Sequence, residues 1–431
     1  MSCGEDSTGP SEPDITPSTL SLAYTGDSSR TVGSSAQYQI PAFSDFGTWS
    51  GSKGSCQITA SWTICTETVF KDYTLYRSDR PDISSDPSAA VELGIFTDLN
   101  VIEFVDNEVN WASVYYYALK TTDTNENSVW SNEASIAVPD AVPDSVVATI
   151  VVGNQPLGIC PLPSGEYVYV TNAGSEDISV ISVASNTVIA TISIGYGVEG
   201  ICSLPSGEYV YVTSPSDDMV FVIRTSDNSL AATLDMDHTS YGICSLPSGE
   251  YVYVTGSGNV YVIQTSDYSV VATIDVGTSA WDICALPSGE YVYVTDAYSD
   301  HVSVIRTLDN SVVATIDVGE RPQGICSLPS GEYVYVTNVD TNNISVIRTL
   351  DNTIAATVDV GNRPRGICSL PAGEYVCVAE YLDSSVRIIR TSDNSTVGVV
   401  DVGNYTGRIC SLSTSEYVYV TQTGNRVSVL R

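Results

Sequence analysis

Residues 324–337 read GICSLPSGEYVYVT, and this motif occurs seven times along the chain. Successive copies are 42 residues apart, with one interval of 40. The cysteine of the motif marks each copy and lies at Cys160, Cys202, Cys244, Cys284, Cys326, Cys368 and Cys410. Because self-similarity at a fixed period of this length is typical of repeat proteins, the sequence predicts seven copies of one structural unit.

Each copy divides into four short segments that favour β-strands. In the copy that begins at Gly324, the segments are GICSL, EYVYVT, ISVIRT and TIAATVDVG, separated by the turns PSG and LDN and by a polar loop. Valine and isoleucine alternate with tyrosine, serine and alanine, so both faces of each strand carry bulky side chains. Such strands fit a small sheet packed between two others, and four of them per period of about 42 residues predict the blade of a β-propeller.

The two ends of the repeat region complement each other. Residues 145–153, SVVATIVVG, match a fourth strand that no first three strands precede, and residues 427–431, VSVLR, match a third strand that no fourth strand follows. Pairing of these segments would complete the last blade and remove an exposed sheet edge. The prediction for residues 145–431 is therefore an all-β, seven-bladed β-propeller whose last blade is closed by the N-terminal strand of the propeller.

The segments GEYVYVTN and VVATIDVG closely resemble the YVTN family of propeller repeats, and the resemblance covers residues 145–431. It departs from the family pattern at VCVAE (376–380) and STSE (413–416), both in the predicted scaffold. The resemblance implies an exported or cell-surface protein, as in archaeal surface layers, without assigned catalysis. It also implies an architecture shared with seven-bladed lactonases, although a shared fold does not confer an activity.

Residues 18–139 have the pattern of a β-sandwich. Short runs rich in β-branched and aromatic residues alternate with turn formers at residues 19–25, 56–63, 72–78, 101–106, 113–123 and 128–138. The segment resembles a fibronectin type III domain in its Trp62 and Tyr76 pair, its predicted core, and in the spacing of Val109 and Tyr115. A Ser/Gly-rich insertion at residues 26–52 departs from that family. The resemblance implies a spacer or binding module.

The remaining segments are a leader and a linker. Residues 1–17 are rich in Ser, Pro and Thr and are predicted to be a disordered leader, and residues 140–144 are a short linker. The start MSCGED resembles the cleavage end of a bacterial lipoprotein signal, which would make Cys3 the lipid-attachment residue; an incidental cysteine is the alternative. The expected location is extracellular or at the cell surface, with a lipid anchor as one form of attachment.

Charge and hydropathy exclude several partners. The formal net charge is −34, and acidic residues occur throughout the chain. Such a field repels nucleic acid and anionic membranes, so neither is an expected partner. No run of 18 apolar residues occurs, so the sequence encodes no transmembrane helix.

The seven repeated cysteines are expected to be buried free thiols that act as small hydrophobic side chains. Equivalent positions in neighbouring blades should lie too far apart for disulfide bonds. A ring of thiolates that binds a metal is the alternative, but a seven-fold ring does not supply tetrahedral ligands. The redox states of Cys56, Cys65 and Cys377 stay open.

Positions that vary among repeats are expected to carry function, because constant positions serve the scaffold. Those just before each inner strand combine arginine forks, which suit carboxylates and phosphates, with flat aromatic platforms for sugar or peptide. The predicted ligand-binding residues are Tyr196, His238, Tyr241, Trp281, Arg321, Arg363, Arg365, Tyr405 and Arg408, with Gln155, Glu199 and Gln323 beside them. The alternative is a set of solvated loop residues with internal ion pairs.

Other charged residues are assigned to the scaffold. Glu208 is expected to pair with Arg224 across two strands, and Glu332 with Arg348. Acidic residues on the outer loops, such as Asp340 and Asp383, could hold a structural Ca²⁺, but no loop has the glycine of a dedicated site, so solvation is favoured. No other cofactor is expected.

Enzyme motifs are absent from the sequence. His238 and His301 are too few for a multi-histidine metal centre, and neither a C-x-x-C-H haem motif nor G-x-S-x-G occurs. The sequence therefore favours a non-enzymatic binding protein that recognises a protein or glycan at the cell surface. The alternatives are a self-assembling subunit of a surface layer or filament, and a lactonase-like hydrolase that uses a carboxylate pair.

Overall fold

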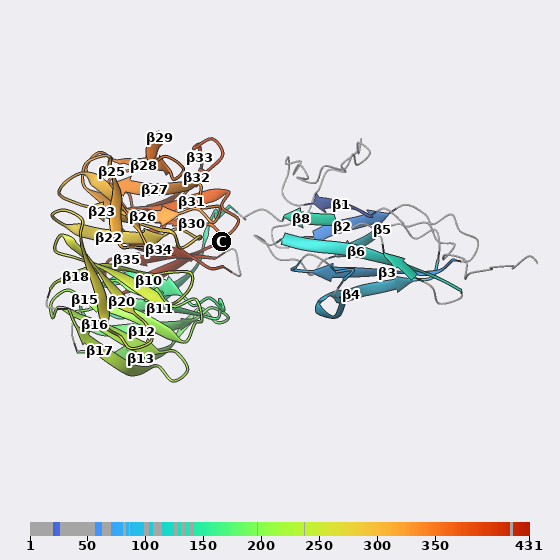
Figure 1. Ribbon diagram of the computed structural model, residues 1–431, viewed down its shortest axis with the longest axis horizontal. Helices are drawn as coiled ribbons and strands as arrows, with labels where there is room; N and C mark the ends of the chain where they lie inside the picture. Colours follow the sequence, from blue (N-terminus) through green and yellow to red (C-terminus); the bar gives the residue numbers. More distant parts are fainter. Residues whose placement is uncertain are drawn as a thin grey trace, which may run out of the picture. The chain divides into compact units, whose positions relative to one another are not determined.

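The computed structural model describes residues 20–25, 57–62, 70–80, 83–85, 87–98, 103–106, 114–124, 128–130, 134–137, 142–195, 197–236, 238–413 and 417–431. The chain divides into two compact units, Met1–Pro139 and Asp140–Arg431. Both are built from strands, as Figure 1 shows. Within the described ranges, no helix has the length and apolarity needed to cross a membrane.

The first unit contains two antiparallel sheets. One has the strand order β1 (Leu20–Thr25), β2 (Gln57–Trp62) and β5 (Glu103–Asp106). The other has the order β4 (Val91–Phe96), β3 (Phe70–Ser78), β6 (Val114–Asp123) and β7 (Ser128–Trp130), with β8 (Ala134–Ala137) also paired to β6 and a 3-10 turn, η1 (Pro87–Ala89), before β4. The strand expected at residues 128–138 is thus two strands, because β6 pairs with one at each end.

The described core of this unit follows the two-residue period of its longest strands. Tyr73 and Leu75 of β3, and Tyr117 and Leu119 of β6, are all fully buried. Residues two apart on a strand share a face, so these four side chains belong to two central strands that pack on one side. The sequence missed β4, whose side chains are mostly exposed and carry little hydrophobic alternation.

Part of the proposed fibronectin-like core can be located. The ring of Tyr76 packs against that of Trp130 in a tilted arrangement, with the centroids 5.1 Å apart and 52° between the planes. Tyr115 is buried. The side chain of Trp62 and the whole of Val109, like Cys3, Cys56 and Cys65, lie outside the described residues.

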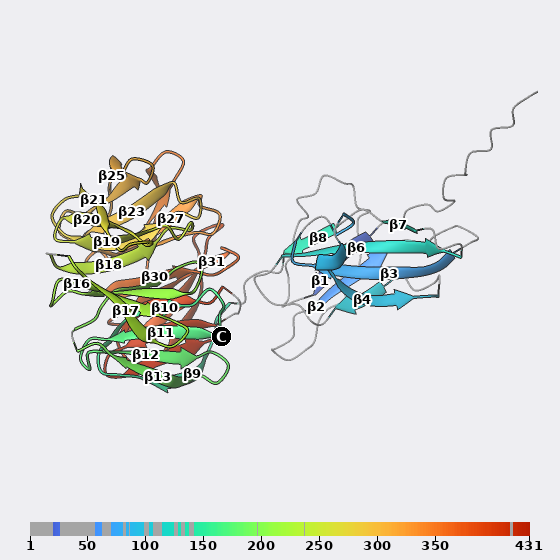
Figure 2. The same cartoon turned by 60° about the horizontal axis from the view of Figure 1, so that its bottom comes forward.

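The second unit contains seven four-stranded antiparallel sheets among its described residues, shown from two sides in Figures 1 and 2. In the first six sheets the strands follow one another along the chain. Their bounds are β10 (Pro156–Pro161), β11 (Tyr167–Asn172), β12 (Asp177–Ser182) and β13 (Thr187–Ser193); β14 (Ile201–Ser203), β15 (Tyr209–Ser214), β16 (Met219–Arg224) and β17 (Ser229–Asp235); β18 (Ser240–Ser245), β19 (Tyr251–Gly256), β20 (Asn259–Gln264) and β21 (Val270–Asp275); β22 (Ala280–Ala285), β23 (Tyr291–Asp296), β24 (His301–Arg306) and β25 (Ser311–Asp317); β26 (Pro322–Ser327), β27 (Tyr333–Asn338), β28 (Asn343–Arg348) and β29 (Thr353–Asp359); β30 (Pro364–Ser369), β31 (Tyr375–Glu380), β32 (Ser385–Arg390) and β33 (Thr396–Asp401).

The seventh sheet is assembled from both ends of this unit. Its strands are β34 (Thr406–Ser411), β35 (Val418–Gln422), β36 (Arg426–Leu430) and β9 (Val146–Val151). Val429 of β36 stands opposite Ala148 of β9 in an antiparallel ladder. The predicted pairing of the two terminal segments is therefore observed, and it gives β36 a neighbour that it would otherwise lack.

Buried side chains join each sheet to the next. Tyr211 and Val222 of the second sheet pack with Val252 and Ile263 of the third, and comparable clusters lie between the other neighbours along the chain. A further cluster combines residues of the seventh sheet with residues of the first, including Val168. The arrangement is all-β and propeller-like, because each sheet buries both faces against others.

The repeated cysteines are free thiols throughout the described residues. Cys202, Cys368 and Cys410 are buried, whereas the other four of the seven are partly exposed. Burial raises the pKa of Cys244 and Cys284, so these thiols stay protonated. The expectation of buried small hydrophobic side chains is confirmed for three positions and only partly for the others.

The predicted Glu208 and Arg224 pair is wrong. In the register of β15 and β16, Arg224 stands opposite Tyr209. Its guanidinium instead approaches Asp227, three residues later in the turn, at 3.5 Å. Arg348 likewise binds Asp351 at 2.6 Å. The error arose because the turn that follows the third strand brings its aspartate back to the arginine, a contact within one turn that strand spacing does not reveal.

A second set of hydrogen bonds connects neighbouring sheets at the turns. The Tyr169 hydroxyl donates to Asn228 Oδ1 of the following sheet at 2.7 Å, and four other tyrosine–asparagine pairs repeat this contact. Each asparagine has a positive φ, near 55°, a conformation that asparagine tolerates better than other side chains. The asparagine thus does two things: it adopts the positive φ that the turn needs, and it accepts a hydrogen bond from the preceding sheet.

The second sheet breaks this pattern. Its tyrosine, Tyr211, has a buried hydroxyl without a hydrogen-bond partner among the described residues. The asparagine position of the next sheet is occupied by Tyr268, which has a φ of 63°. A buried unpaired hydroxyl and a bulky residue at positive φ both destabilise the folded state.

We expect the substitution Tyr268→Asn to stabilise the protein by about 1–2 kcal/mol, because it relieves the backbone and provides an acceptor for Tyr211. The gain is reduced by loss of the contact between Tyr268 and the apolar cluster below it. Calorimetric unfolding of the full chain measures the effect. Asn310→Tyr, which removes the partner of Tyr253, is the reverse control and should lower the melting temperature. An unchanged or lower melting temperature for Tyr268→Asn would contradict this explanation.

Candidate functional site

The site is built on the first strands of the sheets, which contact one another in the second unit. In five sheets the residue two positions before the motif's cysteine is glycine, for example Gly158 and Gly324. A Cβ at Gly158 would meet the carbonyl oxygen of Glu199, and one at Gly324 that of Arg365. Glycine therefore permits adjacent first strands to approach closely.

A threonine hydroxyl fixes the backbone at these strands. Thr171 Oγ1 accepts the N–H of Gly158 at 2.8 Å and donates to the carbonyl of Glu199, in the next sheet, at 2.6 Å. The same threonine in other sheets donates to the carbonyls of Tyr241, Trp281, Gln323 and Arg365. The repeated scaffold thus holds in place the backbone of residues whose side chains vary.

Two sheets replace the glycine with a charged residue. Asp282 in the fourth sheet and Arg408 in the seventh keep the same backbone bond, to Thr295 and Thr421 respectively. Their side chains form an ion pair between Arg408 Nη1 and Asp282 Oδ2, although 126 residues separate them in sequence. This pair links two sheets that are not neighbours along the chain.

Glu199 lies within electrostatic reach of this ion pair. Burial raises the pKa of the Glu199 carboxyl, Arg408 opposes that shift, and Asp282 adds to it. Desolvation outweighs the attraction of the arginine because Arg408 is already engaged with Asp282. Glu199 and Asp282 are the one described carboxylate pair that could serve acid–base chemistry here.

Aromatic side chains in and beside the third and fourth sheets form two pairs. Tyr241 and Trp281 stack with their ring centroids 5.0 Å apart and 19° between their planes. His238, which is exposed, lies beside Tyr261, with ring centroids 6.0 Å apart. Tyr241 directly precedes Gly242, and Trp281 directly precedes Asp282. Both therefore belong to the set of variable residues on the first strands.

At the first strands of the fifth and sixth sheets, the variable positions are mostly arginine residues. The Arg365 guanidinium lies over the ring of Tyr381, 3.7 Å from its centroid, and Tyr381 stacks on Tyr405 at 5.0 Å. Arg365 Nε is buried and has no hydrogen-bond partner among the described residues. Arg365 is therefore oriented by a cation–π contact, and no acidic side chain neutralises it at hydrogen-bond distance in the described structure.

Arg321 and Arg363 share one acidic partner. Asp340 Oδ1 lies 3.9 Å from a terminal nitrogen of Arg321 and 3.5 Å from one of Arg363. Both arginines have positive φ values, 56° and 53°. An αL arginine is uncommon and costs free energy, and such residues are enriched at functional sites. We call Arg321, Arg363 and Arg365 the arginine cluster.

The electrostatic effect of the cluster is visible at Arg365. Burial lowers the pKa of Arg365, and Arg363, Arg321 and Arg408 lower it further, while Tyr381 opposes the shift. Arginine nevertheless stays charged in proteins. The cluster therefore concentrates positive charge, with Asp340 alone between its outer members, in a chain whose formal net charge is −34.

Gln323 adds a polar group beside the cluster. It occupies in the fifth sheet the position that Arg365 occupies in the sixth, and it is 7% exposed. Its backbone carbonyl accepts from Thr295, but its side-chain amide makes no hydrogen bond to any described residue. The amide atoms are not among the fully buried polar atoms that lack a partner, so they can hydrogen-bond to solvent or to a ligand.

The structure locates most of the predicted site residues. Asp340 brings Arg321 and Arg363 together. Tyr381 contacts both Arg365 and Tyr405, and Tyr241 stacks on Trp281. Tyr196 lies outside the described residues. Gln155 is exposed with a φ of 52° and has no part in these contacts. His238 stacks on Tyr261 apart from the ion pair and the arginine cluster.

Sequence reasoning missed two residues. Asp282 breaks the GIC motif in the same way as Arg408, so comparing the repeats position by position could have paired them. Tyr381 follows the second strand of the sixth sheet, and no pattern in the sequence indicated that it would lie under Arg365.

The acidic outer-loop residues have structural partners. Asp383 accepts from the backbone and side chain of Asn362, both at 2.7 Å, and Asp300 accepts the backbone N–H of Arg321 at 2.8 Å. Among described residues, no group of three or more His, Cys, Asp or Glu side chains could hold a metal ion. These carboxylates order the loops that carry the arginines.

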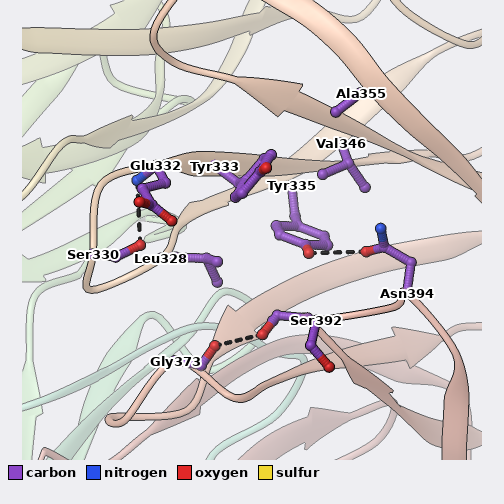
Figure 3. A pocket seen from close by; sticks show the side chains of 11 residues that line it. Leu328, Ser330, Glu332, Tyr333, Tyr335, Val346, Ala355, Gly373, Ser392 and Asn394 are labelled. Carbon is purple, nitrogen blue, oxygen red and sulfur yellow. Dashed lines mark hydrogen bonds between the residues drawn. The ribbon is translucent and has the colours of Figure 1, made fainter. Parts of the chain in front are cut away.

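A cavity of about 460 Å³ lies elsewhere, between the fifth and sixth sheets. Figure 3 shows Tyr333, Tyr335 and Asn394 in its lining, with the hydrogen bond from Tyr335 to Asn394. The lining comes from strands and turns of the repeated scaffold, so the cavity contains none of the predicted ligand-binding residues.

Comparisons with known proteins address the fold alone. No protein-family model matches the chain, and no curated protein matches it. A chain of hydrazine synthase from Kuenenia stuttgartiensis is similar in structure, with a TM-score of 0.59 and 18% sequence identity. The match covers 64% of this chain and 95% of that one. This similarity supports a propeller-like architecture.

We expect Glu199→Gln to raise the stability of the protein at neutral pH, because glutamine avoids burying a charge. A carboxyl whose pKa is raised on folding stabilises the folded state below the ordinary glutamate pKa and loses that contribution as pH rises through the raised value. The advantage of Glu199→Gln should therefore be absent in acid and appear across that interval. Denaturant unfolding as a function of pH measures it, with the exposed Glu208→Gln as control. A constant difference at all pH values would refute the burial argument.

We expect Asp282→Gly and Arg408→Gly each to destabilise the protein by about 1–2 kcal/mol, since either leaves a partly buried charge without its partner. The double variant restores the glycine found in the other five sheets and should be more stable than the sum of the two single losses predicts. A double-mutant cycle in denaturant measures this coupling. Additive losses would show that the ion pair contributes nothing as a pair.

Proposed function

We propose that residues 145–431 form a closed, seven-bladed β-propeller of the YVTN type, and that residues 18–139 form a fibronectin type III-like sandwich. Seven four-stranded sheets, the pairing of β9 with β36 and the apolar cluster between the seventh and first sheets support the closed ring. The three-stranded and five-stranded sheets of the first unit support the sandwich.

We further propose that the protein is a non-enzymatic binding protein that recognises a carboxylate-bearing glycan at the arginine cluster. The observation that carries this proposal is that the guanidiniums of Arg321 and Arg363 share one partly exposed carboxylate, while Arg365 has no carboxylate partner among the described residues. A surface that concentrates positive charge in so acidic a chain attracts an anion. Guanidinium forks bind carboxylates through two parallel hydrogen bonds, which gives both affinity and orientation.

Aromatic side chains next to the cluster favour a sugar as the rest of the ligand. Tyr405 is 46% exposed and stacks on Tyr381, which in turn supports Arg365. Flat, partly exposed rings offer an apolar face to a sugar ring while their polar edges stay hydrated. Gln323 would supply an amide for a ligand hydroxyl or carboxylate, since its own side chain has no bond to a described residue.

The cellular location is part of the same proposal. An extracellular or cell-surface protein, with Cys3 as the lipid-attachment residue, fits the resemblance to exported YVTN proteins. In that setting a fibronectin-like spacer would present the binding face of the propeller to glycans outside the cell. Recognition itself would need no chemistry, because the ligand is held by charge and stacking.

A glycan array with the full chain tests the proposal. We expect glycans that contain hexuronic acids to bind and their neutral or methyl-esterified counterparts not to bind. Preferential binding to acidic peptides would replace the glycan with a protein partner. Equal binding of neutral sugars, or no retention of any anion, would refute the anion site. Turnover of lactones would favour a hydrolase instead.

We expect Arg365→Gln and Arg363→Ala each to weaken binding of the best acidic glycan by about ten-fold or more, because each removes a charge-assisted contact. Arg365→Lys keeps the charge but loses the fork, so it should retain only part of the affinity. Isothermal calorimetry at two salt concentrations measures both affinity and its electrostatic part. Arg348→Ala, which alters an exposed turn pair, is the control that should bind like the unmodified protein.

A further inference from the structure

The first and second strands of each sheet place one pair of residues directly opposite each other. In six sheets the repeated cysteine faces a tyrosine, as Cys326 faces Tyr335 and Cys410 faces Tyr419. In the sixth sheet the tyrosine is replaced, and Cys368 faces Cys377. The six sheets with a cysteine–tyrosine pair therefore serve as an internal comparison for the sixth sheet, in which both members of the pair are cysteines.

The two thiols lie on the same side of the sheet. Residues directly opposite in an antiparallel ladder point to the same face, and their Cα atoms lie about 4.5–5.5 Å apart. That separation falls within the range of about 4.4–6.8 Å that a disulfide bond requires. Both Cys368 and Cys377 belong to the apolar cluster between the sixth and seventh sheets, with Ile409 and Val418 across from them. Backbone movement is not needed to join them.

The sixth sheet also lacks two of the hydrogen bonds that tie other sheets to their successors. In five sheets the tyrosine donates to an asparagine in a turn of the next sheet, as Tyr335 does. The next sheet here is the seventh, whose third and fourth strands, β36 and β9, come from opposite ends of the unit and share no such turn. A tyrosine at position 377 would thus have no asparagine to bind. The bridging threonine is absent too, since Ala379 occupies its place.

We propose that Cys368 and Cys377 form a cross-strand disulfide bond when the chain folds in the presence of a disulfide oxidant. A thiolate of one cysteine attacks the oxidant to give a mixed disulfide, and the thiolate of the other displaces the oxidant's second sulfur. One S–S bond forms in the protein and one breaks in the oxidant. Two protons are lost by the protein, and the oxidant is reduced to two thiols.

The bond would form before the sheets pack and would then be protected. Cys377 is fully buried and Cys368 is 9% exposed in the folded unit, so a soluble oxidant reaches them only while the sixth and seventh sheets are apart. Once formed, the bond joins β30 to β31 in the sheet against which the last sheet packs. It would hold together the one sheet that has neither the tyrosine nor the threonine contact.

Peptide mapping of the full chain tests this bond directly. The protein is refolded with oxidised and reduced glutathione, unfolded under acid, alkylated and digested. Cleavage after Arg365, Glu374 and Arg387 separates the two cysteines into different peptides. We expect residues 366–374 to remain joined to the peptide that contains Cys377, without alkylation, until a reductant is added.

Two controls make the result specific. Cys326 and Cys410, which face tyrosines, should be alkylated in the same sample. Cys377→Tyr, which restores the residue of the other six sheets, should leave Cys368 alkylated, and Cys377→Ser serves the same purpose if the tyrosine variant does not fold. Full alkylation of both Cys368 and Cys377 in the oxidatively refolded protein, or a bond from either one to another cysteine, would overturn the proposal.

Discussion

Close contact between neighbouring first strands is the constraint on which the second unit depends. A threonine hydroxyl in six of the seven second strands accepts an N–H of its own sheet and donates to a carbonyl of the next sheet, as Thr171 does with Gly158 and Glu199. In five of the seven sheets the residue at this point is glycine, and an added Cβ there would meet the backbone carbonyl of the neighbouring strand. The apolar clusters then fill the space between sheets, so backbone hydrogen bonding and side-chain packing impose the same spacing.

Departures from the repeat are informative because the other copies show what each position normally does. Tyr268 replaces an asparagine and leaves the Tyr211 hydroxyl unpaired. Asp282 and Arg408 replace glycines and bind each other. Cys377 replaces a tyrosine and stands opposite another cysteine. The first of these costs stability, the second joins distant sheets, and the third creates a pair of thiols that no other repeat contains.

The binding proposal joins this scaffold to its variable residues. The threonine contacts hold the backbone of Trp281, Gln323 and Arg365, so the side chains at these positions can change without loss of the fold. Arg365 is then oriented by Tyr381, and the loops of Arg321 and Arg363 are ordered by acidic and amide side chains. A rigid framework that presents charged and aromatic side chains reduces the entropy lost on binding.

The sequence by itself determined the period, the four strands per repeat, the pairing of the terminal segments and the region of the variable residues, because these depend on local patterns that recur seven times. It named Arg363, Arg365 and Arg408 but could not give their partners. The tertiary structure decided that Asp340 is shared, that Tyr381 lies under Arg365, and that Asp282 reaches Arg408 across 126 residues. It also corrected Arg224, whose partner is Asp227. Such contacts depend on how separate sheets and turns meet in space. Neither strand periodicity nor composition gives the distance between side chains that are far apart in the sequence.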